Sequence, residues 1–570
     1  MSIVAPAYGH HYAVSAGHEY AAQAAVEVLE GGGNAIDAGV AAVLTLGVVY
    51  SDQVSIAGVA PMMVHLAESG QTWTVAGVGG WPQALEVERF IAAHGGSIPP
   101  GVQRCVVPAA PDACLQALSL WGTLTYSDVA RRAIGYARDG FPRHHVMVDY
   151  LQQFAGDYRQ WPDNLDIWLP GGEVPAIGSR FVQRDLAATL QFLCDQERSA
   201  AGGRLAGLDA VHDAFYRGDI ASAMISHVRD HGGLLSAADL ASFRCAVTPS
   251  LSRRVCLNDE AVEVHTCGAW SQGPTLLAAL NVIEGFAVTA LGHNSAEYLH
   301  ILAETLKLAL ADREAYIGDP AFVDVPLAAL LSENYGASQR ARIDLRHASP
   351  GLPAPGIIDG YRPFLSQPDE GLTRPMPDTS IVAVIDQQGN SFCATPSDPS
   401  WDTPVVPGTG LVISSRGSQS RAVAGHPACL APGKRPRLTP NPCFARVAGR
   451  WIMPFGTPGG DTQVQANLQL LLNHLSFKLP LQDAIEAPRL MTHSQPDSFA
   501  PNRSAAGRVT VEGRVAESAC TALGKRGHKI ERVAEWTHWM AGLCAVKKDL
   551  RSGQLEAGAD PRRGSRAMAW

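Results

Sequence analysis

Several features that would point to other classes of protein are missing from this chain. Its 570 residues contain no run of 18 consecutive apolar residues, which argues against a membrane-spanning helix. The eleven cysteines form no C-x-x-C pair, so we expect buried free thiols rather than a zinc or redox site. No dense run of Lys and Arg is present and the net charge is −9, which argues against nucleic-acid binding. There is also no Gly-x-Ser-x-Gly, the sequence of a serine hydrolase elbow.

The first residues lack a positively charged start followed by an apolar run, the pattern of a secretory signal. We therefore expect a soluble, cytoplasmic protein that does not associate with membranes. The histidine pairs His10-His11 and His144-His145 have no third ligand nearby in the sequence, so solvated loops are the favoured interpretation. We expect neither a metal nor an organic cofactor.

Helical patterns are clearest in two parts of the chain. Residues 20–29 and 35–46 each carry apolar residues typical of a helix, and Gly-Gly-Gly-Asn at 31–34 separates them. No strand precedes these glycines and no Gly-Lys-Ser/Thr follows, so a helix junction is favoured over a phosphate loop. Residues 295–317 have leucines three or four positions apart and predict a long helix.

The segment 349–378 has a different composition, because it contains seven prolines. Such a stretch predicts an exposed, irregular linker. The β-branched run 379–386, a Gly-Asn turn and the run 391–395 then predict a buried hairpin. The linker therefore delivers the chain to a threonine, Thr379, that opens a strand.

A threonine in this position can be a nucleophile or an ordinary strand residue. A hydroxyl reacts poorly without a base beside it, and one such base is the residue's own α-amino group. Its reference pKa of about 7.7 to 8.0 suits a general base at neutral pH. The amine becomes free only if the preceding peptide bond is cut. The local pattern at Thr379 does not decide between the two roles, because β-branched residues are common in strands.

A resemblance to a known family favours the first role. The run from Asp378 to Asn390 resembles the nucleophile segment of the gamma-glutamyltranspeptidase family. Further similar segments occur in the family's order over most of residues 15–565: 31–38, 232–240, 304–320, 432–436, 456–460, 484–489 and 558–563. Among its members, the chain looks closer to the amidohydrolases and acylases than to true transpeptidases.

The resemblance implies an α+β fold, the four-layer αββα sandwich of the N-terminal-nucleophile hydrolases. It also implies a precursor that cleaves itself between Asp378 and Thr379. The large subunit would be residues 1–378 and the small subunit 379–570, and the two would remain one folded unit. A homodimer of this processed unit is an open alternative.

The same resemblance carries residue roles to this sequence. Gly459 and Gly460 match the paired glycines whose backbone N–H groups stabilise the oxyanion, although a plain glycine turn is the alternative. Thr395 and Ser397 match hydroxyl groups that orient the nucleophile; strand and turn polarity would also explain them. Thr439 matches one of two serines near the oxyanion site.

The departures from the family concern the grip on a γ-glutamyl group. Val78 stands where an Arg holds its carboxylate, and Ser418 and Gln419 stand where an acid holds its amine. A pocket without these charges should reject a zwitterionic head group. Arg416 and Arg437 are candidates for binding a carboxylate in a new place; alternatively, they are surface residues or form ion pairs between the two subunits.

Three functions remain open from the sequence. The first is an autoprocessed amidohydrolase that forms an acyl-enzyme on Thr379 with a small amide substrate, oxamate-type amides being one option. The second is a true γ-glutamyl hydrolase or transferase of glutathione-type substrates. The third is an uncleaved homologue that only binds a ligand, against which the intact junction and glycine pair argue. The acyl group, the leaving amine and the choice between hydrolysis and transfer are not specified.

Overall fold

Two antiparallel sheets of seven strands form the centre of the molecule. The structure is a computed structural model, and it describes residues 3–371 and 378–570. The first sheet has the order β21 (Arg566–Ala569), β2 (Ala13–Ala16), β10 (Val382–Ile385), β11 (Ser391–Ala394), β3 (Met62–His65), β4 (Thr72–Val75), β7 (Val247–Pro249). The second has the order β1 (Ala7–Gly9), β20 (Leu555–Ala559), β19 (Cys544–Asp549), β15 (Trp451–Gly456), β14 (Cys443–Val447), β9 (Glu260–Thr266), β8 (Leu251–Leu257).

The two sheets pack face to face, and β10 illustrates why. Successive side chains of a strand point to opposite faces. Ala383 and Ile385 lie in a core between the sheets together with Phe444 of β14. Val382 and Val384 point the other way, into the core beneath the helices. Because both faces are covered, the strand is apolar throughout, as its sequence predicts.

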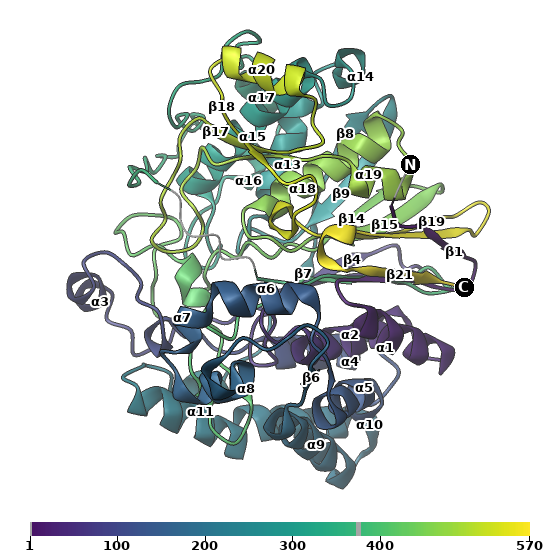
Figure 1. Cartoon of the computed structure of the whole chain (residues 1–570), viewed down its shortest axis with the longest axis vertical. Helices are drawn as coiled ribbons and strands as arrows, with labels where there is room; N and C mark the ends of the chain where they lie inside the picture. Colours follow the sequence, from purple (N-terminus) through teal and green to yellow (C-terminus); the bar gives the residue numbers. More distant parts are fainter. Residues whose placement is uncertain (1–2, 372–377) are drawn as a thin grey trace.

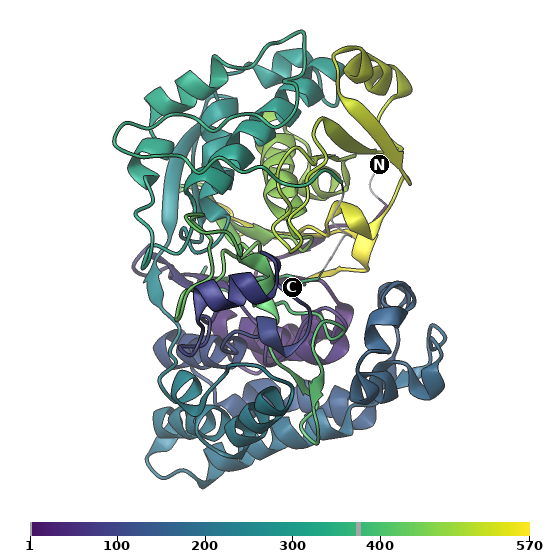
Figure 2. The ribbon, with the colours of Figure 1, turned by 90° about the vertical axis from the view of Figure 1, so that its left-hand side faces the viewer.

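Helices cover the outer face of each sheet. The first sheet carries α1 (Glu19–Glu30), α2 (Ala35–Val49), α4 (Ala110–Trp121) and α5 (Tyr126–Asp139). The second carries α13 (Gly273–Ile283), α15 (Ala296–Tyr316), α18 (Thr462–Leu471) and α19 (Leu481–Glu486). The strands thus run between two helical layers in both views (Figures 1 and 2). The predicted α+β, four-layer αββα sandwich is confirmed.

The helices predicted at the N-terminus and at 295–317 are present. Asn34 ends the glycine run and caps α2, because its side chain accepts hydrogen bonds from the backbone of Ile36 and Asp37. The carboxylate of Asp386, just after β10, accepts a hydrogen bond from the backbone N–H of Ala35 at 3.0 Å. The glycine run is therefore a helix junction that fixes α2 against the strand leading from Thr379.

Further helices occupy the region between α5 and β7. They are α6 (His145–Gln153), α7 (Ala155–Tyr158), α8 (Pro162–Trp168), α9 (Arg184–Ser199), α10 (Gly203–Tyr216), α11 (Asp219–Asp230) and α12 (Ala237–Ala241). Residues 108–196 are thus mainly helical. A small sheet of β16 (Leu490–Thr492), β17 (Arg508–Glu512) and β18 (Lys529–Val533) lies beside α15 and α18.

The strand after the linker begins later than predicted. β10 starts at Val382, so Thr379 lies three residues before it in an irregular segment. The described part of the linker, 349–371, contains no helix, and it forms a β-bridge between Glu370 and Ser504. It also hydrogen-bonds to α15 and the residues beside it, for example from the backbone N–H of Gly356 to Asp312 at 2.8 Å. The linker prediction also covers 372–377, which lie outside the described residues.

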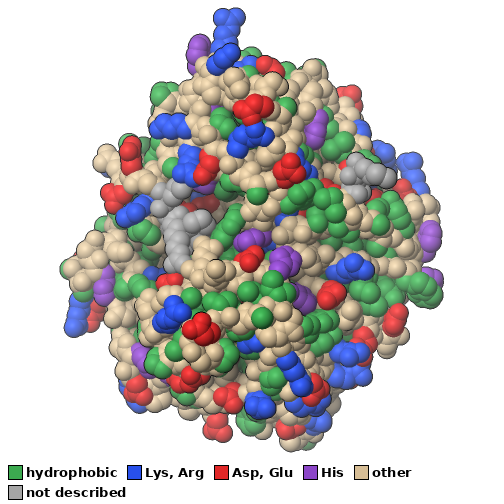
Figure 3. Space-filling view, viewed as in Figure 1, with side chains coloured by type: hydrophobic (Ala, Val, Ile, Leu, Met, Phe, Trp, Pro, Cys, Tyr) green, Lys and Arg blue, Asp and Glu red, His purple; other side chains and the backbone are tan. Residues whose placement is uncertain are grey.

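Each sheet combines strands from both sides of the Asp378–Thr379 junction. In the first sheet, β10 and β11 lie between β2 and β3, and in the second, β14 lies between β15 and β9. Such interleaving would hold two chains together after a cut at the junction. The face in Figure 3 carries Lys, Arg, Asp and Glu side chains intermixed. Among the described residues, no helix has the length and apolar character needed to cross a bilayer.

Candidate active site

Thr379 is fully buried and its hydroxyl meets two polar side chains. The oxygen lies 2.6 Å from the hydroxyl oxygen of Ser397 and 3.0 Å from a carboxylate oxygen of Asp378, to which it donates. Ser397 follows β11, the partner strand of β10. The backbone N–H of Thr379 donates to the carbonyl of Gln53 at 3.2 Å. The hairpin thus brings together two of the predicted hydroxyl groups.

The backbone at Thr379 is strained. Its φ angle is 84°, in the left-handed region that β-branched residues rarely occupy. Such a conformation costs about 1 to 3 kcal/mol and persists only where the surroundings enforce it. The strained N–Cα bond adjoins the peptide bond between Asp378 and Thr379. Breaking that peptide bond would release the strain, because φ constrains the chain only while residue 378 is attached.

Arg416 is a buried charged residue at the junction, next to the buried Asp378. It belongs to a short 3-10 helix, Arg416–Gln419, and is fully buried. Its Nη2 donates to Asp378 and, at 2.5 Å, to the hydroxyl of Ser397, and its Nε lies 3.3 Å from Asp398. Of the two arginines considered from the sequence, this one contacts Asp378 and Ser397, the two side chains that hydrogen-bond the Thr379 hydroxyl.

Arg437 has a structural environment instead. Its guanidinium pairs with Glu314 of α15 and donates to the backbone carbonyl of Arg313 at 2.9 Å. Glu314 also pairs with Arg421, so the carboxylate collects several cations in the core. No contact among the described residues joins Arg437 to Thr379. The structure therefore supports the ion-pair alternative for Arg437 and gives no support for contact with substrate.

Burial and the neighbouring arginine act in opposite directions on the acids of this site. Burial raises the pKa of Asp378, and Arg416 together with the Thr379 hydroxyl partly offsets the rise. Burial likewise raises the pKa of Asp398 to about 6, against the pull of Arg416 and of hydrogen bonds from Ser414 and Ser415. Both acids are thus better proton acceptors than exposed carboxylates.

The remaining predicted hydroxyl groups lie in different settings. Thr395 is fully buried, but no described residue is a hydrogen-bond partner of its hydroxyl, so the orienting role assigned to it has no support in the uncut chain. Thr439 exchanges hydrogen bonds with the side-chain amide of Gln419, at 2.8 and 3.0 Å. Gln272 donates to the carbonyls of both Thr439 and Gly460. Thr439 is therefore tied to the glycine pair rather than to Thr379.

Gly459 and Gly460 follow β15 and precede α18. Their φ angles of 120° and 58° are ones that glycine adopts without strain. A side chain on Gly460 would come within 3.3 Å of the ring of Phe499, which in turn lies 5.6 Å from the guanidinium carbon of Arg416. Phe499 thus links the glycine pair to the buried arginine.

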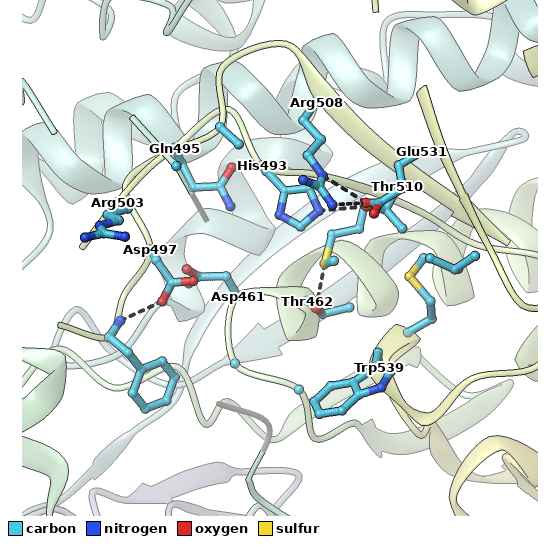
Figure 4. A pocket seen from close by; sticks show the side chains of 18 of the residues that line it. Asp461, Thr462, His493, Gln495, Asp497, Arg503, Arg508, Thr510, Glu531 and Trp539 are labelled. Carbon is cyan, nitrogen blue, oxygen red and sulfur yellow. Dashed lines mark hydrogen bonds and ion pairs between the residues drawn. The ribbon is translucent and has the colours of Figure 1, made fainter. Parts of the chain in front are cut away.

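The glycine pair also borders a cavity of about 430 Å³. Figure 4 shows its two charged sides: Arg508 and Glu531 pair on one, and Asp461 and Asp497 lie together on the other. Burial and the neighbouring Asp461 raise the pKa of Asp497 to about 7. Trp539 contributes an apolar wall. The cavity has the size of a small-molecule site.

Uncharged residues occupy the positions where family members bind the γ-glutamyl carboxylate and amine. Val78 is buried in an apolar cluster that includes Trp270 and Leu438. Both atoms of the Gln419 side-chain amide are used by Thr439. Neither position offers a charge to an amino-acid head group.

The histidines that the sequence argued against as metal ligands contact other side chains. His144 caps α6 and stacks on Tyr50, and His11 stacks on Trp570. Within residues 3–371 and 378–570, the three-residue group that could hold an ion is the buried set His300, Glu304 and His528. Its carboxylate is already paired with Lys307 at 2.6 Å, and its two imidazoles bond each other at 2.8 Å.

Sequence reasoning missed three residues at the junction. Asp398 holds Arg416, Gln53 receives the N–H of Thr379, and Arg563 donates to Gln53 and, at 3.5 Å, to the carbonyl of Thr379. Arg563 falls in the last segment of the family resemblance, which was the one signal available for it. Asp398 and Gln53 gave no signal, because their roles depend on contacts between distant segments.

Comparisons with known proteins identify the family of this chain. The sequence profile of the gamma-glutamyltranspeptidase family matches residues 21–570, and the chain belongs to this family. It is 30% identical to the glutathione hydrolase-like YwrD proenzyme of Bacillus subtilis, covering 96% of both chains. It is 29% identical to the oxamate amidohydrolase proenzyme of Klebsiella pneumoniae, covering 98% of both. The crystal structure of cephalosporin acylase from Bacillus halodurans matches with a TM-score of 0.85 at 27% identity, covering 100% of this chain and 98% of that one.

Proposed function

We propose that this chain is a self-cleaving amidohydrolase whose nucleophile is Thr379. The observation that carries the proposal is the buried Thr379 hydroxyl, 2.6 Å from Ser397, on a residue with a strained φ of 84° directly after Asp378. The names of the relatives support it, since an oxamate amidohydrolase and a cephalosporin acylase both act on amides. The word proenzyme in two of those names supports processing of one precursor.

Self-cleavage proceeds by transfer of an acyl group. The Thr379 hydroxyl attacks the carbonyl carbon of Asp378, the C–N bond breaks, and the nitrogen takes up a proton as the new α-amine. Asp378 is then joined to Thr379 through an ester. Water hydrolyses this ester and leaves a carboxylate on residue 378 and a free hydroxyl on Thr379.

Turnover repeats the chemistry on an external amide. The free α-amine accepts the hydroxyl proton while the oxygen attacks the amide carbon, and the proton passes to the leaving amine. Backbone N–H groups at Gly459 and Gly460 stabilise the oxyanion, and the cavity beside them has room for the leaving amine. Water then releases the acid. Each step uses groups of this chain, so we expect chelators to leave turnover unchanged.

A γ-glutamyl hydrolase is the second candidate, favoured by the name of the YwrD relative. A screen of simple amides and γ-glutamyl anilide, with released amine as the readout, separates the two. A rapid quench during turnover should also show the small subunit heavier by one acyl group, carried on the peptide that begins with Thr379. An adduct on any other peptide, or turnover by a Thr379→Ala variant, would contradict the proposal.

A further inference from the structure

The uncut chain already contains an acyl group at the nucleophile. In self-cleavage, the carbonyl that Thr379 attacks belongs to Asp378, so the processing ester is an acyl-enzyme with an aspartyl acyl group. The side-chain carboxylate of this acyl group is fully buried and bonded to Arg416. The junction therefore indicates which acyl chemistry the site holds next to the nucleophile.

The guanidinium of Arg416 has more hydrogen-bond donors than its partners in the uncut chain use. Asp398 is fixed by hydrogen bonds from Ser414 and Ser415 and lies 3.3 Å from Nε. Asp378 and Ser397 are both reached by Nη2. Nη1 donates no hydrogen bond to any described residue, although it is buried. When Asp378 departs after cleavage, as the proposed function requires, Nη2 loses its carboxylate partner and Nη1 still has no acceptor among the described residues.

A buried guanidinium with open donors is costly, and a carboxylate is its best complement. An acid that is free of the polypeptide can turn to meet both Nη1 and Nη2, which Asp378 does not. The ring of Phe499, 5.6 Å from the guanidinium carbon, closes one side of this position. Beyond Phe499 lies Gly460 at the edge of the cavity.

We infer that Arg416 binds a free carboxylate on the acyl part of the substrate, and that the preferred substrates are monoamides of four-carbon dicarboxylic acids, of which succinamate is the simplest. This inference rests on the proposed function. In an aspartyl acyl group, two carbon atoms separate the reacting carbonyl from the carboxylate. Succinamate reproduces this spacing, whereas the two carbonyl carbons of oxamate are directly bonded.

The test uses the mature wild-type enzyme and two sets of amides. The first pair is succinamate and butanamide, in which a methyl group replaces the carboxylate. The second is a length series of oxamate, malonamate, succinamate and glutaramate. We expect kcat/KM for succinamate to exceed that for butanamide by about tenfold or more, since a hydrogen bond to a charged group is lost. We also expect the length series to peak at succinamate.

Inhibition and an arginine variant complete the test. Succinate should inhibit or, by calorimetry, bind the mature enzyme, and butyrate should not. Arg416→Lys should lose most of the preference for succinamate over butanamide, measured on the fraction of this variant that is cleaved. If Arg416→Lys stays uncut, the wild-type comparison of succinate with butyrate decides. Equal kcat/KM for succinamate and butanamide, a peak at another length, or no binding of succinate would overturn the inference. A chain that never cleaves would instead refute the proposed function, which intact mass reveals separately.

Discussion

The hydroxyl of Thr379 donates a hydrogen bond to the carboxylate of Asp378, with 3.0 Å between the oxygens. In the proposed self-cleavage, the residue whose peptide bond is broken thus offers an acceptor for the proton of the attacking hydroxyl. Burial raises the pKa of this carboxyl, which strengthens it as a base. Asp378 can therefore assist its own cleavage before the α-amine of Thr379 exists.

This relationship predicts the behaviour of Asp378→Asn. The amide keeps the shape of the side chain but cannot take the proton, so self-cleavage should slow by about 100-fold or more. A time course on denaturing gels measures the rate. Asp369→Asn is the matched control, because Asp369 is an exposed acid in the same linker. Equal cleavage rates for Asp378→Asn and wild type would exclude a role for the carboxylate.

The glycine pair gives a second prediction. In Gly459→Ala, the φ of 120° becomes strained and the N–H groups that we propose stabilise the oxyanion shift, so kcat should fall by about 10²-fold or more. Gly449→Ala is the control, since Gly449 has a φ of 66° in the turn between β14 and β15 with open space around it. The comparison fails to support the role if the two variants lose activity equally.

A third prediction concerns stability against pH. Asp52 is fully buried, one of its oxygens has no described hydrogen-bond partner, and burial raises its pKa to about 6. An acid whose pKa is higher in the folded than in the unfolded protein stabilises the folded state fully below the unfolded pKa of 3.8. This stabilisation is lost as the pH rises through the folded pKa of about 6. Relative to Asp52→Asn, the free energy of unfolding should therefore fall by about 1 to 3 kcal/mol between pH 4 and pH 7.

Urea unfolding at the two pH values measures this difference. Both proteins should carry Thr379→Ala so that a single uncut chain is compared. A gap between them that stays constant with pH would show that Asp52 does not titrate in this range.

The fourth prediction is that γ-glutamyl compounds are poor substrates. Val78 and Gln419 occupy the positions of the two charged partners, and Gln419 is already paired with Thr439. Losing two charge-assisted hydrogen bonds would cost about 3 to 6 kcal/mol, or roughly two to four orders of magnitude in kcat/KM. The cleaved enzyme is assayed on γ-glutamyl anilide and on simple acyl amides. Efficient turnover of the anilide alone would reject this argument.

Local patterns predicted the elements around the junction better than its contacts. The glycine run, the long helix and the buried hairpin follow from residues close together in sequence, and the structure contains each of them. Arg416 and Arg437 cannot be told apart from the sequence, yet Arg437 pairs with Glu314 of α15 and Arg416 pairs with Asp378. Tertiary packing determines which arginine lies at the junction, and no local sequence pattern predicts that packing. The strain at Thr379 is likewise a property of the folded chain.

The intact mass of the purified protein tests the central claim most directly. The account predicts that wild type and Thr379→Ser, which keeps a hydroxyl, yield two chains of about two thirds and one third of 60.4 kDa, the smaller beginning at residue 379. Thr379→Ala should remain one chain of full mass. A stable full-length wild type, or a Thr379→Ala protein cut at the same bond, would contradict it.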